Sequence, residues 1–164
     1  MLPAVIATER LHLLPLYRTT ARAIVNEQRT GERWHDEFPR RDDRDAARRA
    51  LRHGDQVFGC FAIVEVDTGL TIGTIGFFGP PDAAGAAMVG CGLVPAARGQ
   101  GYATEALRAL ADYAFAQPAV RRLLADPPND NVALHRVLEK AGFRHTHTTD
   151  DFRWYAVENV ATAA

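Results

Sequence analysis

A short turn at residues 98–103, where a predicted strand leads directly into a predicted helix, constrains the fold of this chain more than any other segment. Its sequence is Arg-Gly-Gln-Gly-Tyr-Ala, and Pro95 closes the strand before it. Glycines in such a turn let backbone N–H groups approach an anion without obstruction by side chains. The start of a helix adds unpaired N–H donors and the positive end of the helix dipole. The segment therefore predicts a strand–turn–helix unit that suits a diphosphate, with Arg98 supplying a permanent charge.

Two nucleotide-binding motifs and a purely structural turn are the alternatives for these residues. A P-loop needs a Gly-Lys-Ser/Thr sequence, which is absent. A dinucleotide-binding turn needs a third glycine where Thr104 stands, although Asp126, at the end of the next predicted strand, could bind a ribose. The dinucleotide-binding alternative is weakened because the turn follows a predicted hairpin in the middle of the chain. The glycines could also serve only to make a tight turn.

The rest of the chain predicts alternating strands and helices, with no internal repeat and no linker. The hydrophobic pattern predicts strands at residues 9–16, 57–66, 70–78, 87–94, 122–125, 143–148 and 152–157. It predicts helices at residues 19–28, 42–53, 101–116 and 131–141. Expected caps are Thr19 or Thr20, Asp42 or Asp43, and Asn129 or Asn131, with Gly54 and Gly142 as helix stops. This order indicates a single α+β (mixed α/β) domain over residues 1–164.

Composition excludes several classes of protein. The chain has 164 residues, of which 47% are hydrophobic and 24% charged, which is typical of a globular domain and not of a disordered one. Its formal net charge of -1 offers no global field to nucleic acid. No signal peptide and no apolar run long enough for a membrane span is evident, so the cytoplasm is expected. Cys60 and Cys91 lie in apolar runs as reduced buried thiols, without the spacing of a zinc site.

Two segments resemble the motifs of one family. Residues 98–106 resemble motif A of the GNAT acetyltransferase superfamily, whose pattern Arg/Gln-x-x-Gly-x-Gly/Ala is filled by Arg98, Gly101 and Ala103. The continuation over residues 101–106 is similar to the branch that acetylates ribosomal-protein N-termini and related amines. Residues 131–143 resemble motif B, Asn-x-x-Ser-x-Arg-x-x-Glu-Lys-x-Gly-Phe. The resemblance implies the GNAT fold: a mostly antiparallel twisted sheet of about six to seven strands with about four helices, splayed at an acyl-CoA cleft.

The resemblance also implies which residues hold acetyl-CoA. Backbone amides of residues 99–104 would bind its pyrophosphate, and a backbone N–H near Leu93 would polarise the thioester carbonyl as an oxyanion hole. Leu93, Val94 and Asn131 would bond to the pantetheine arm, whereas Glu139 and Lys140 look structural. The full set of expected coenzyme contacts is Leu93, Val94, Arg98, Gly99, Gln100, Gly101, Tyr102, Ala103, Thr104, Asn131 and Arg136.

Three positions at which relatives handle protons are apolar here. Met88 stands where many members of this branch carry a glutamate on the strand before motif A. Leu134 replaces the motif B serine, and Leu138 occupies the position of a tyrosine found in other members. The sequence therefore lacks the usual general acid and base, although an amine held beside the thioester gains much from proximity alone.

Asp126 and His135 are the remaining catalytic candidates. Asp126-Pro127, followed by Asn131, resembles the spacing of some aminoglycoside acetyltransferases in which that aspartate serves as base. The alternative is an aspartate that caps a turn before proline. His135 lies next to the expected thiol position, but a lone histidine is more often structural.

No metal is expected. His145 and His147 are predicted on one face of a strand, where they form either a solvated edge or a metal pair. Cys91 occupies a position where relatives often have tyrosine, and core packing is its main interpretation.

The loop between the two early helices shapes the acceptor pocket in this fold. That places the substrate-binding hypothesis on Trp34, His35 and Phe38, whose rings could enclose an amine. Glu32, Asp36 and Glu37 in the same loop would attract a cation. The alternative is a surface loop pinned by Trp34 and Phe38 in a small apolar cluster.

The resemblance thus implies transfer of an acetyl group from acetyl-CoA to a primary amine by direct attack. The acceptor could be a peptide N-terminus, an amino acid, an aminoglycoside or another small amine. The protein would be a monomer or homodimer with no nucleic-acid or membrane partner. One alternative is an acyl-CoA-binding module that has lost its general acid and base, and another is a nucleotide-binding domain.

Overall fold

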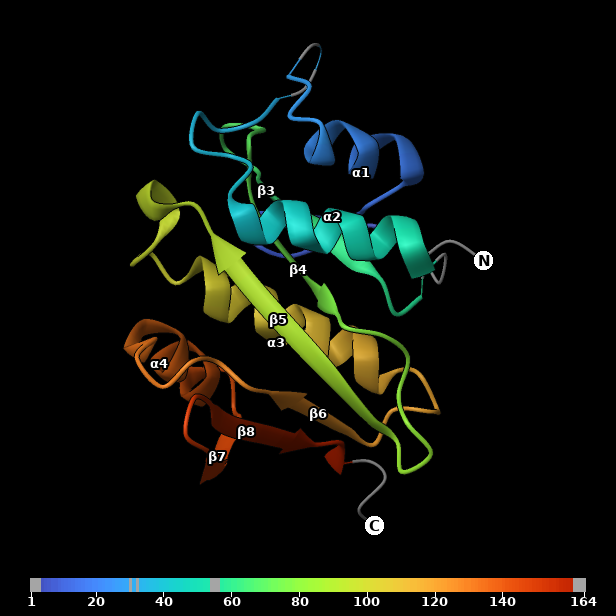
Figure 1. Ribbon diagram of the computed structural model, residues 1–164, viewed down its shortest axis with the longest axis vertical. Coiled ribbons are helices and arrows are strands. Elements are labelled where there is room, and N and C mark those ends of the chain that lie inside the picture. Colours follow the sequence, from blue (N-terminus) through green and yellow to red (C-terminus); the bar gives the residue numbers. More distant parts are fainter. Residues whose placement is uncertain (1–3, 30, 32, 54–56, 161–164) are drawn as a thin grey trace.

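A twisted sheet with helices on both faces makes up the protein (Figure 1). The computed structural model describes residues 4–29, 31, 33–53 and 57–160. The strands are β1 (Ile6–Ala7), β2 (Leu11–Pro15), β3 (Cys60–Glu65), β4 (Thr71–Phe77), β5 (Ala86–Leu93), β6 (Arg122–Ala125), β7 (Arg144–Thr148) and β8 (Arg153–Glu158). The helices are α1 (Arg18–Val25), α2 (Arg41–His53), α3 (Tyr102–Phe115) and α4 (Val132–Lys140), with a 3₁₀ turn, η1, at Pro95–Ala97.

The described strands form one sheet in the order β1-β2-β3-β4-β5-β6-β8-β7. Every neighbouring pair is antiparallel except β5 and β6, which are parallel. The predicted mixed α/β, mostly antiparallel architecture is confirmed, with an 8-stranded sheet in place of the expected six to seven strands. The additional strand, β1, has only 2 residues, too few to leave a periodic pattern in the sequence.

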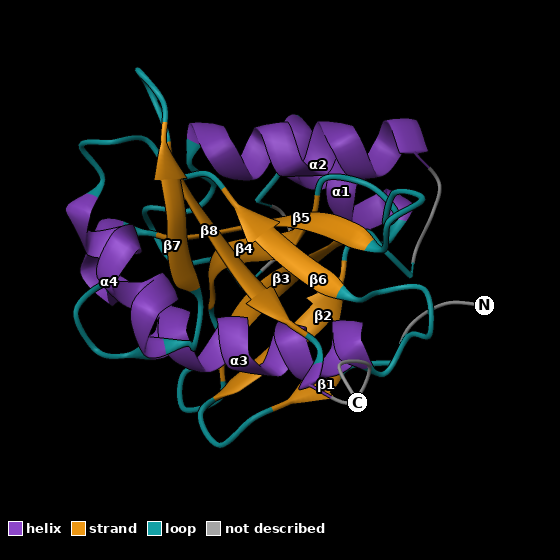
Figure 2. Cartoon of the chain, turned by 90° about the horizontal axis from the view of Figure 1, so that it is seen from below, coloured by secondary structure: helices purple, strands orange, loops and turns teal. Residues whose placement is uncertain are grey.

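The helices lie in two layers, as Figure 2 shows: α1 and α2 cover one face of the sheet, and α3 and α4 cover the other. The α3 pattern explains its place, because Ala106, Leu107, Leu110 and Ala114 recur on one face and are all buried. β4 is buried along its whole length because it lies between these layers. No helix in the described part of the chain has the length and apolar character to cross a bilayer.

The helix ends test the predicted caps. The Asn131 cap is confirmed, since its Oδ1 accepts a hydrogen bond from the Leu134 amide at 3.2 Å. The predicted caps of α1 are wrong: that helix begins at Arg18, and Tyr17, which precedes it, makes no capping bond through its side chain. Asp43 lies inside α2 and reaches back to accept from the Arg40 amide at 2.9 Å. Gly54, the predicted stop of α2, lies outside the described residues.

In the exposed edge strand β7, the prediction that His145 and His147 lie on one face is wrong. A bulge between His145 and His147 pairs them with Tyr155 and Trp154, which are consecutive residues of β8. Consecutive strand residues point to opposite faces, so the two histidines do not share a face. His147 stacks on Trp154 with ring centroids 5.4 Å apart, and His145 lies against Tyr155.

The parallel pair β5 and β6 opens along its length. Register pairs join Ala86–Met88 to Arg122–Leu124 and stop there, whereas β5 stays paired with β4 as far as Leu93. Figure 1 shows the two strands diverging from their paired ends. The β6-facing side of β5, from Val89 to Leu93, therefore borders an opening in the middle of the sheet. This opening positions the candidate site.

Candidate active site at the opening between β5 and β6

A cavity of about 720 Å³ occupies this opening and touches both helix layers. On one side it is lined by the turn before α3 and by α4, including Arg98, Gly101 and Asn131. On the other it is lined by α2 and the end of β4, including Arg40 and Phe78. One continuous space thus connects the two faces of the sheet through the gap between β5 and β6.

The turn before α3 has the backbone geometry of an anion site. Gly99 and Gly101 have φ values of 79° and 83°, in the left-handed region that favours glycine. Glu105 donates its amide to the Gly101 carbonyl at 3.1 Å, so the amides of Tyr102, Ala103 and Thr104 precede the first bond of the helix and lack partners within it. A Cβ at Gly99 would meet no atom within 4 Å, so the space in front of the turn is open. A diphosphate fits this cradle.

The back of the turn is held by side chains from the first strands. The Tyr102 hydroxyl donates to Glu65 Oε2 at 2.7 Å, which holds the pKa of the Glu65 carboxyl below its ordinary value. Arg10 donates through Nη1 to the Gln100 carbonyl at 2.8 Å. These bonds fix the turn from behind and leave its front to a ligand.

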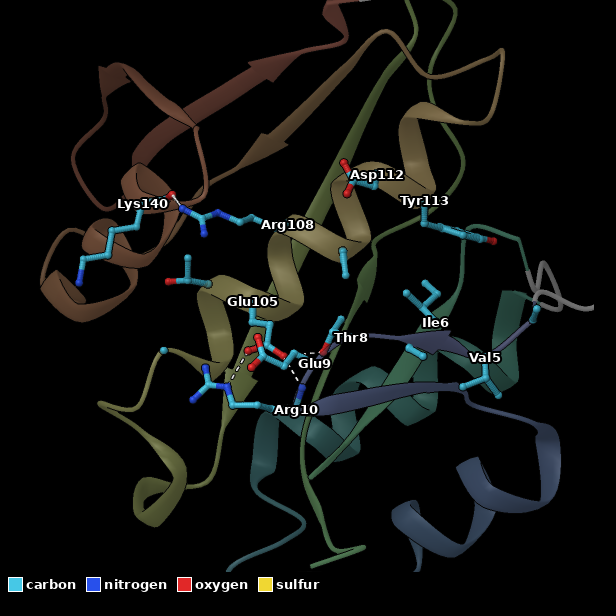
Figure 3. Close-up of a pocket in the computed structure, with 15 residues that line it drawn as sticks. Val5, Ile6, Thr8, Glu9, Arg10, Glu105, Arg108, Asp112, Tyr113 and Lys140 are labelled. Atoms are coloured by element: carbon cyan, nitrogen blue, oxygen red, sulfur yellow. Dashed lines mark hydrogen bonds and ion pairs between the residues drawn. The ribbon is translucent and has the colours of Figure 1, made fainter. Parts of the chain in front are cut away.

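Glu105, in the first turn of α3, completes this support (Figure 3). It accepts from the Thr8 hydroxyl at 2.5 Å and from Arg10 through both the amide, at 2.9 Å, and Nε, at 2.7 Å. Burial opposes ionisation of the carboxyl, but these hydrogen bonds outweigh it and hold the pKa of Glu105 below its ordinary value. The start of α3 is therefore tied by a charged network to the segment between β1 and β2.

The groove drawn in Figure 3 is a second cavity, of about 1080 Å³, between α3 and the first residues of the chain described. The described residues that line it include Val5, Ile6, Arg108 and Asp112, and none comes from β5 or β6. Although larger, it does not reach the opening in the sheet, so the smaller cavity is the candidate active site.

The open side of β5 presents backbone amides to the cavity. Met88 and Val94 bond to β4, through the Phe78 amide at 2.9 Å and the Ile72 carbonyl at 2.8 Å. Hydrogen-bond direction alternates along an antiparallel strand, so the amides of Val89, Cys91 and Leu93 point the other way, toward the gap. The predicted oxyanion donor at Leu93 therefore lies at the opening. Its carbonyl accepts from Arg98 Nε at 3.0 Å, which ties the strand to the turn.

Two of the predicted coenzyme residues do not line the cavity. Val94 is fully buried, and its amide is already bonded to β4, so it has no N–H to offer to a pantetheine arm. Gln100 is exposed, and its side chain bonds to the Ala96 carbonyl at 3.3 Å. The remaining nine predicted positions do line it: Leu93, Arg98, Gly99, Gly101, Tyr102, Ala103, Thr104, Asn131 and Arg136.

The first residues of α4 contribute polar groups. Asn131 uses Oδ1 to cap α4, which leaves its amide N–H₂ group available on the cavity side. Arg136 also lines the cavity and is exposed. Glu139 accepts from the Tyr155 hydroxyl at 3.3 Å, which fits a structural role.

Asp126 follows β6 directly and lines the cavity at the opening. Burial raises the pKa of its carboxyl above the ordinary value, although a backbone hydrogen bond opposes this shift. A carboxylate that holds a proton more tightly than usual is a better base for an ammonium group.

His135 is placed differently from Asp126. It is buried on α4, outside the cavity lining, with Nε2 2.9 Å from the Pro128 carbonyl and its ring against Tyr155. It therefore fixes the segment that follows Asp126 and makes no contact with the space where an acyl group would lie.

At the three positions where relatives carry proton-transfer residues, the structure places apolar side chains at or near the cavity. Leu134 and Leu138 line the cavity, and Met88 lies in the paired part of β5 opposite Leu124. Cys91 also lines the cavity, and burial raises the pKa of its thiol to about 12. The thiol stays protonated near neutral pH and is a poor nucleophile.

The residues of the predicted acceptor loop do not line this cavity. Trp34 and Phe38 are buried in the core, with rings packed edge to face at 5.4 Å, and neither lines the cavity. His35 accepts through Nδ1 from the Glu37 amide at 3.0 Å, and Glu37 accepts from the Ala96 amide at 2.9 Å. This is the pinned loop that the sequence left as an alternative. Glu32 lies outside the described residues.

The α2 side of the cavity is organised by residues that the sequence did not single out as site residues. Arg40, just before α2, binds the fully buried Asp43 through Nη2 at 2.7 Å and Nε at 3.0 Å. The Thr74 hydroxyl of β4 donates to the same carboxylate at 2.6 Å. Acidic and basic residues are mixed over residues 40–45, and nothing in that pattern distinguishes the buried Asp43 from its exposed neighbours.

No group of three or more His, Cys, Asp or Glu side chains suited to a metal ion occurs among the residues that the structure describes.

Comparison with known proteins places these features in a family. A sequence profile for the Acetyltransferase (GNAT) domain matches residues 10–144. A curated relative, the uncharacterized N-acetyltransferase YjdG of Bacillus subtilis, is 31% identical over 101 residues. That match covers 62% of this chain and 60% of YjdG, so it spans less than two thirds of the relative.

Solved structures share the fold at low identity. RimL, a ribosomal-protein alpha-N-acetyltransferase determined with coenzyme A, has a TM-score of 0.71 and 17% identity, covering 94% of this chain and 98% of RimL. A ribosomal-protein-alanine acetyltransferase from Vibrio fischeri has a TM-score of 0.71 and 16% identity, covering 96% of this chain and 98% of its own.

Proposed function

The chain belongs to the GNAT acetyltransferase family, and on that premise we propose that it transfers an acetyl group from acetyl-CoA to a primary amine by direct attack. The observation that carries this proposal is the single cavity through the sheet. Direct transfer needs the coenzyme and the amine to meet in one space, and this cavity joins the anion-binding turn to the α2 face. Proximity of this kind can supply much of the rate enhancement.

The coenzyme side supplies binding and polarisation. We assign the pyrophosphate to the amides of residues 99–104, with Arg98 and Arg136 as charged partners. We assign the Asn131 side-chain N–H₂ group, which the helix cap leaves unused, to the pantetheine arm. The Leu93 amide, on the open side of β5, would donate to the thioester carbonyl oxygen. RimL, which shares the fold, was determined with coenzyme A, and this supports the assignment of the ligand.

Proton transfer falls to Asp126. When bound, acetyl-CoA supplies the acetyl group as a thioester whose C–S bond breaks as the new C–N bond forms. The Asp126 carboxylate accepts a proton from the ammonium group of the acceptor, and its raised pKa favours that transfer. The neutral amine then attacks the thioester carbon, and CoA leaves as a thiolate that takes up a proton from solvent. We assign His135 to positioning: its bond to the Pro128 carbonyl fixes the backbone that carries Asp126.

We also propose that residues 1–164 act as one catalytic domain in the cytoplasm. One apolar core cluster draws residues from all the long helices and from strands on both sides of the opening. Cys60 and Cys91 are free thiols, which is compatible with a reducing compartment.

A two-part measurement tests the function. Thermal shift with CoA reports coenzyme binding, and thiol release from acetyl-CoA against a panel of amines reports transfer. We expect CoA to raise the melting temperature and at least one primary amine to release thiol. CoA binding without release on any amine would instead identify an acyl-CoA-binding module, and protection by NAD alone would identify a nucleotide-binding domain.

A further inference from the structure

Two arginines line the α2 end of the cavity. Arg40 and Arg49 lie there together with Phe78, the glycines of β5 and two aspartates, Asp42 and Asp45. An amine acceptor would be cationic in water, so a pair of arginines is unexpected in a pocket that had only to admit an amine. The charges indicate that the acceptor also carries an anionic group.

Arg40 is held ready for such a group. Its guanidinium is bonded on one side to Asp43, through Nε and Nη2. An arginine has five N–H donors, so three remain. Asp42 lies 3.9 Å from Nη1, but its side chain is 81% exposed and is a solvated neighbour. The guanidinium is therefore oriented by the protein, with donors left over.

The missing side chain of Gly92 brings Arg40 close to the reacting centre. A Cβ at Gly92 would fall 2.4 Å from Arg40 Nη2, so the guanidinium lies directly on the backbone of β5. Gly92 lies in the part of β5 that has no partner in β6, next to the Leu93 amide that we assign to the thioester. A group bound by Arg40 would sit within a few bonds of the attacking nitrogen.

Arg49 supplies the charge that is not neutralised. It lies over the ring of Phe78, with the guanidinium carbon 4.3 Å from the ring centroid. Its Nε is buried without a hydrogen-bond partner, and no carboxylate pairs with it among the described residues. Asp45, one turn earlier, is bonded to Arg48 at 2.9 Å. With Asp43 bonded to Arg40 and Asp45 bonded to Arg48, Arg49 is the guanidinium left for the carboxylate of a ligand.

We propose that the acceptor is a small zwitterionic amine, of the amino-acid type, whose carboxylate binds Arg40 and Arg49 while its ammonium group faces Asp126. This inference rests on the proposed acetyl transfer and names its substrate class. Guanidinium groups recognise carboxylates through paired N–H donors. Asp126, which directly follows β6, lines the same cavity as the two arginines beside and on α2. These opposite charges would orient the acceptor with its nitrogen toward the opening.

Matched pairs of amines test the proposal. Thiol release from acetyl-CoA is measured with common α-amino acids, β-alanine and γ-aminobutyrate, each against its carboxamide, and with O-phosphoethanolamine. We expect the preferred acid to exceed its amide in kcat/KM by about tenfold or more, mainly through KM. Equal or better use of the amides, or a preference for the phosphate ester over every carboxylate, would overturn the assignment.

Variants locate the preference. Arg49→Gln keeps much of the stem against Phe78 and should bring the acid-to-amide ratio close to one. Arg40→Lys keeps a positive charge beside Asp43 but loses the paired N–H donors of the guanidinium. The acid-to-amide ratio of kcat/KM should therefore fall while the fold is retained. Arg48→Gln is the matched control, because Arg48 lies on the same helix outside the cavity lining, and its ratio should match the wild type. An unchanged ratio in both Arg49→Gln and Arg40→Lys would overturn the proposal.

A binding measurement separates this inference from the proposed function. Thermal shift in the presence of CoA is recorded with each acid and each amide. Protection by an acid and not by its amide, without thiol release, would support the carboxylate site and contradict the transfer. Thiol release on acids and amides alike would support the transfer and contradict the carboxylate site. Neither protection nor release with any amine would contradict both.

Discussion

The half of the cavity formed by residues 98–104 and α4 presents mainly backbone amides, whereas the half formed by α2, β4 and β5 presents side chains from distant segments. In the first half, two glycines and a helix start provide the donors within a few consecutive residues. In the second, Asp43 bonds both to Arg40 and to Thr74, which is 31 positions away in the sequence. We call the first the coenzyme half and the second the acceptor half, after the ligands that we assign to them. Coenzyme binding should therefore tolerate side-chain changes of the kind that disable the acceptor half. It should be lost when the backbone geometry of the coenzyme half is altered.

Removing Asp43, which bonds to Arg40 and Thr74 in the acceptor half, should cause the greatest effect, a loss of stability. Asp43→Ala leaves Arg40 without its buried partner, and such changes cost about 3–5 kcal/mol in unfolding free energy. Asp42→Ala, at a side chain 81% exposed, is the control and should shift it by less than about 0.5 kcal/mol. Urea denaturation measures both. If the two variants were equally stable, the buried pair would not organise this half of the cavity.

A backbone change should disable the coenzyme half in turn. Gly101→Val forces a branched side chain into a conformation with φ of 83° and places its Cβ 3.3 Å from Arg10 Nη2. Loss of two or more amide contacts to a charged group should weaken CoA binding by a factor on the order of 1,000. Titration calorimetry measures the Kd. Gly79→Ala, in a loop outside the cavity with open space around it, is the control and should leave the Kd unchanged. Equal losses of CoA affinity in the two variants would contradict the assignment of the pyrophosphate to residues 99–104.

The boundary between the halves is tested at Asp126. Asp126→Asn should lower kcat by roughly 100-fold at neutral pH while the Kd for CoA stays the same. The acidic limb of the pH–rate profile, which reflects deprotonation of a carboxyl with raised pKa, should disappear. Asp130→Asn, an exposed neighbour outside the cavity lining, is the control. Unchanged kcat would remove Asp126 from proton transfer.

Asp126→Asn, which should lower kcat, should raise the stability of the fold at neutral pH. Because the folded state raises the pKa of Asp126, it binds that proton more tightly than the unfolded chain does. Stability therefore falls as pH rises between the unfolded and folded pKa values, and Asp126→Asn should be more stable than the wild type near pH 7. Thermal melts across pH measure this, and a less stable Asn variant at every pH would contradict the stated cause.

A modest effect is expected for the support behind the turn. The pKa of Glu105 is lowered, so its contribution to stability is present above the unfolded pKa and is lost as pH falls through the folded value. Glu105→Gln should cost about 1 kcal/mol at neutral pH, and the difference from the wild type should shrink on acidification. Glu158→Gln, in an exposed pair with Arg122, should cost less than about 0.5 kcal/mol. A pH-independent difference for Glu105→Gln would contradict the charged network.

The coenzyme half was largely predictable because it depends on local sequence patterns. The turn at 98–103, the Asn131 cap and the opening beside Leu93 are of this kind, and the structure places nine of the eleven predicted coenzyme residues at the cavity. Val94 failed because the direction of its amide depends on strand register, which the pattern does not reveal. The bulge in β7 was missed for the same reason.

The acceptor half could not be predicted because burial of a charged residue is a tertiary property. Asp43 stands in a run of alternating charges that looks solvated, and only the approach of Thr74 and the space over Gly92 make it a buried anchor. The aromatic residues Trp34 and Phe38 suggested a binding loop but joined the core. A signal was available in the glycine of β5 at position 92, since glycine within a strand often marks a close approach.

Initial-rate kinetics with both substrates varied would show whether coenzyme and amine meet in one cavity. Direct attack requires both to be bound at once, so we expect double-reciprocal plots that intersect. Parallel lines would indicate that the protein first accepts the acetyl group itself, for which Cys91 would be the candidate despite a thiol pKa of about 12. Intersecting lines would support a shared cavity for the two substrates, and parallel lines would contradict direct transfer.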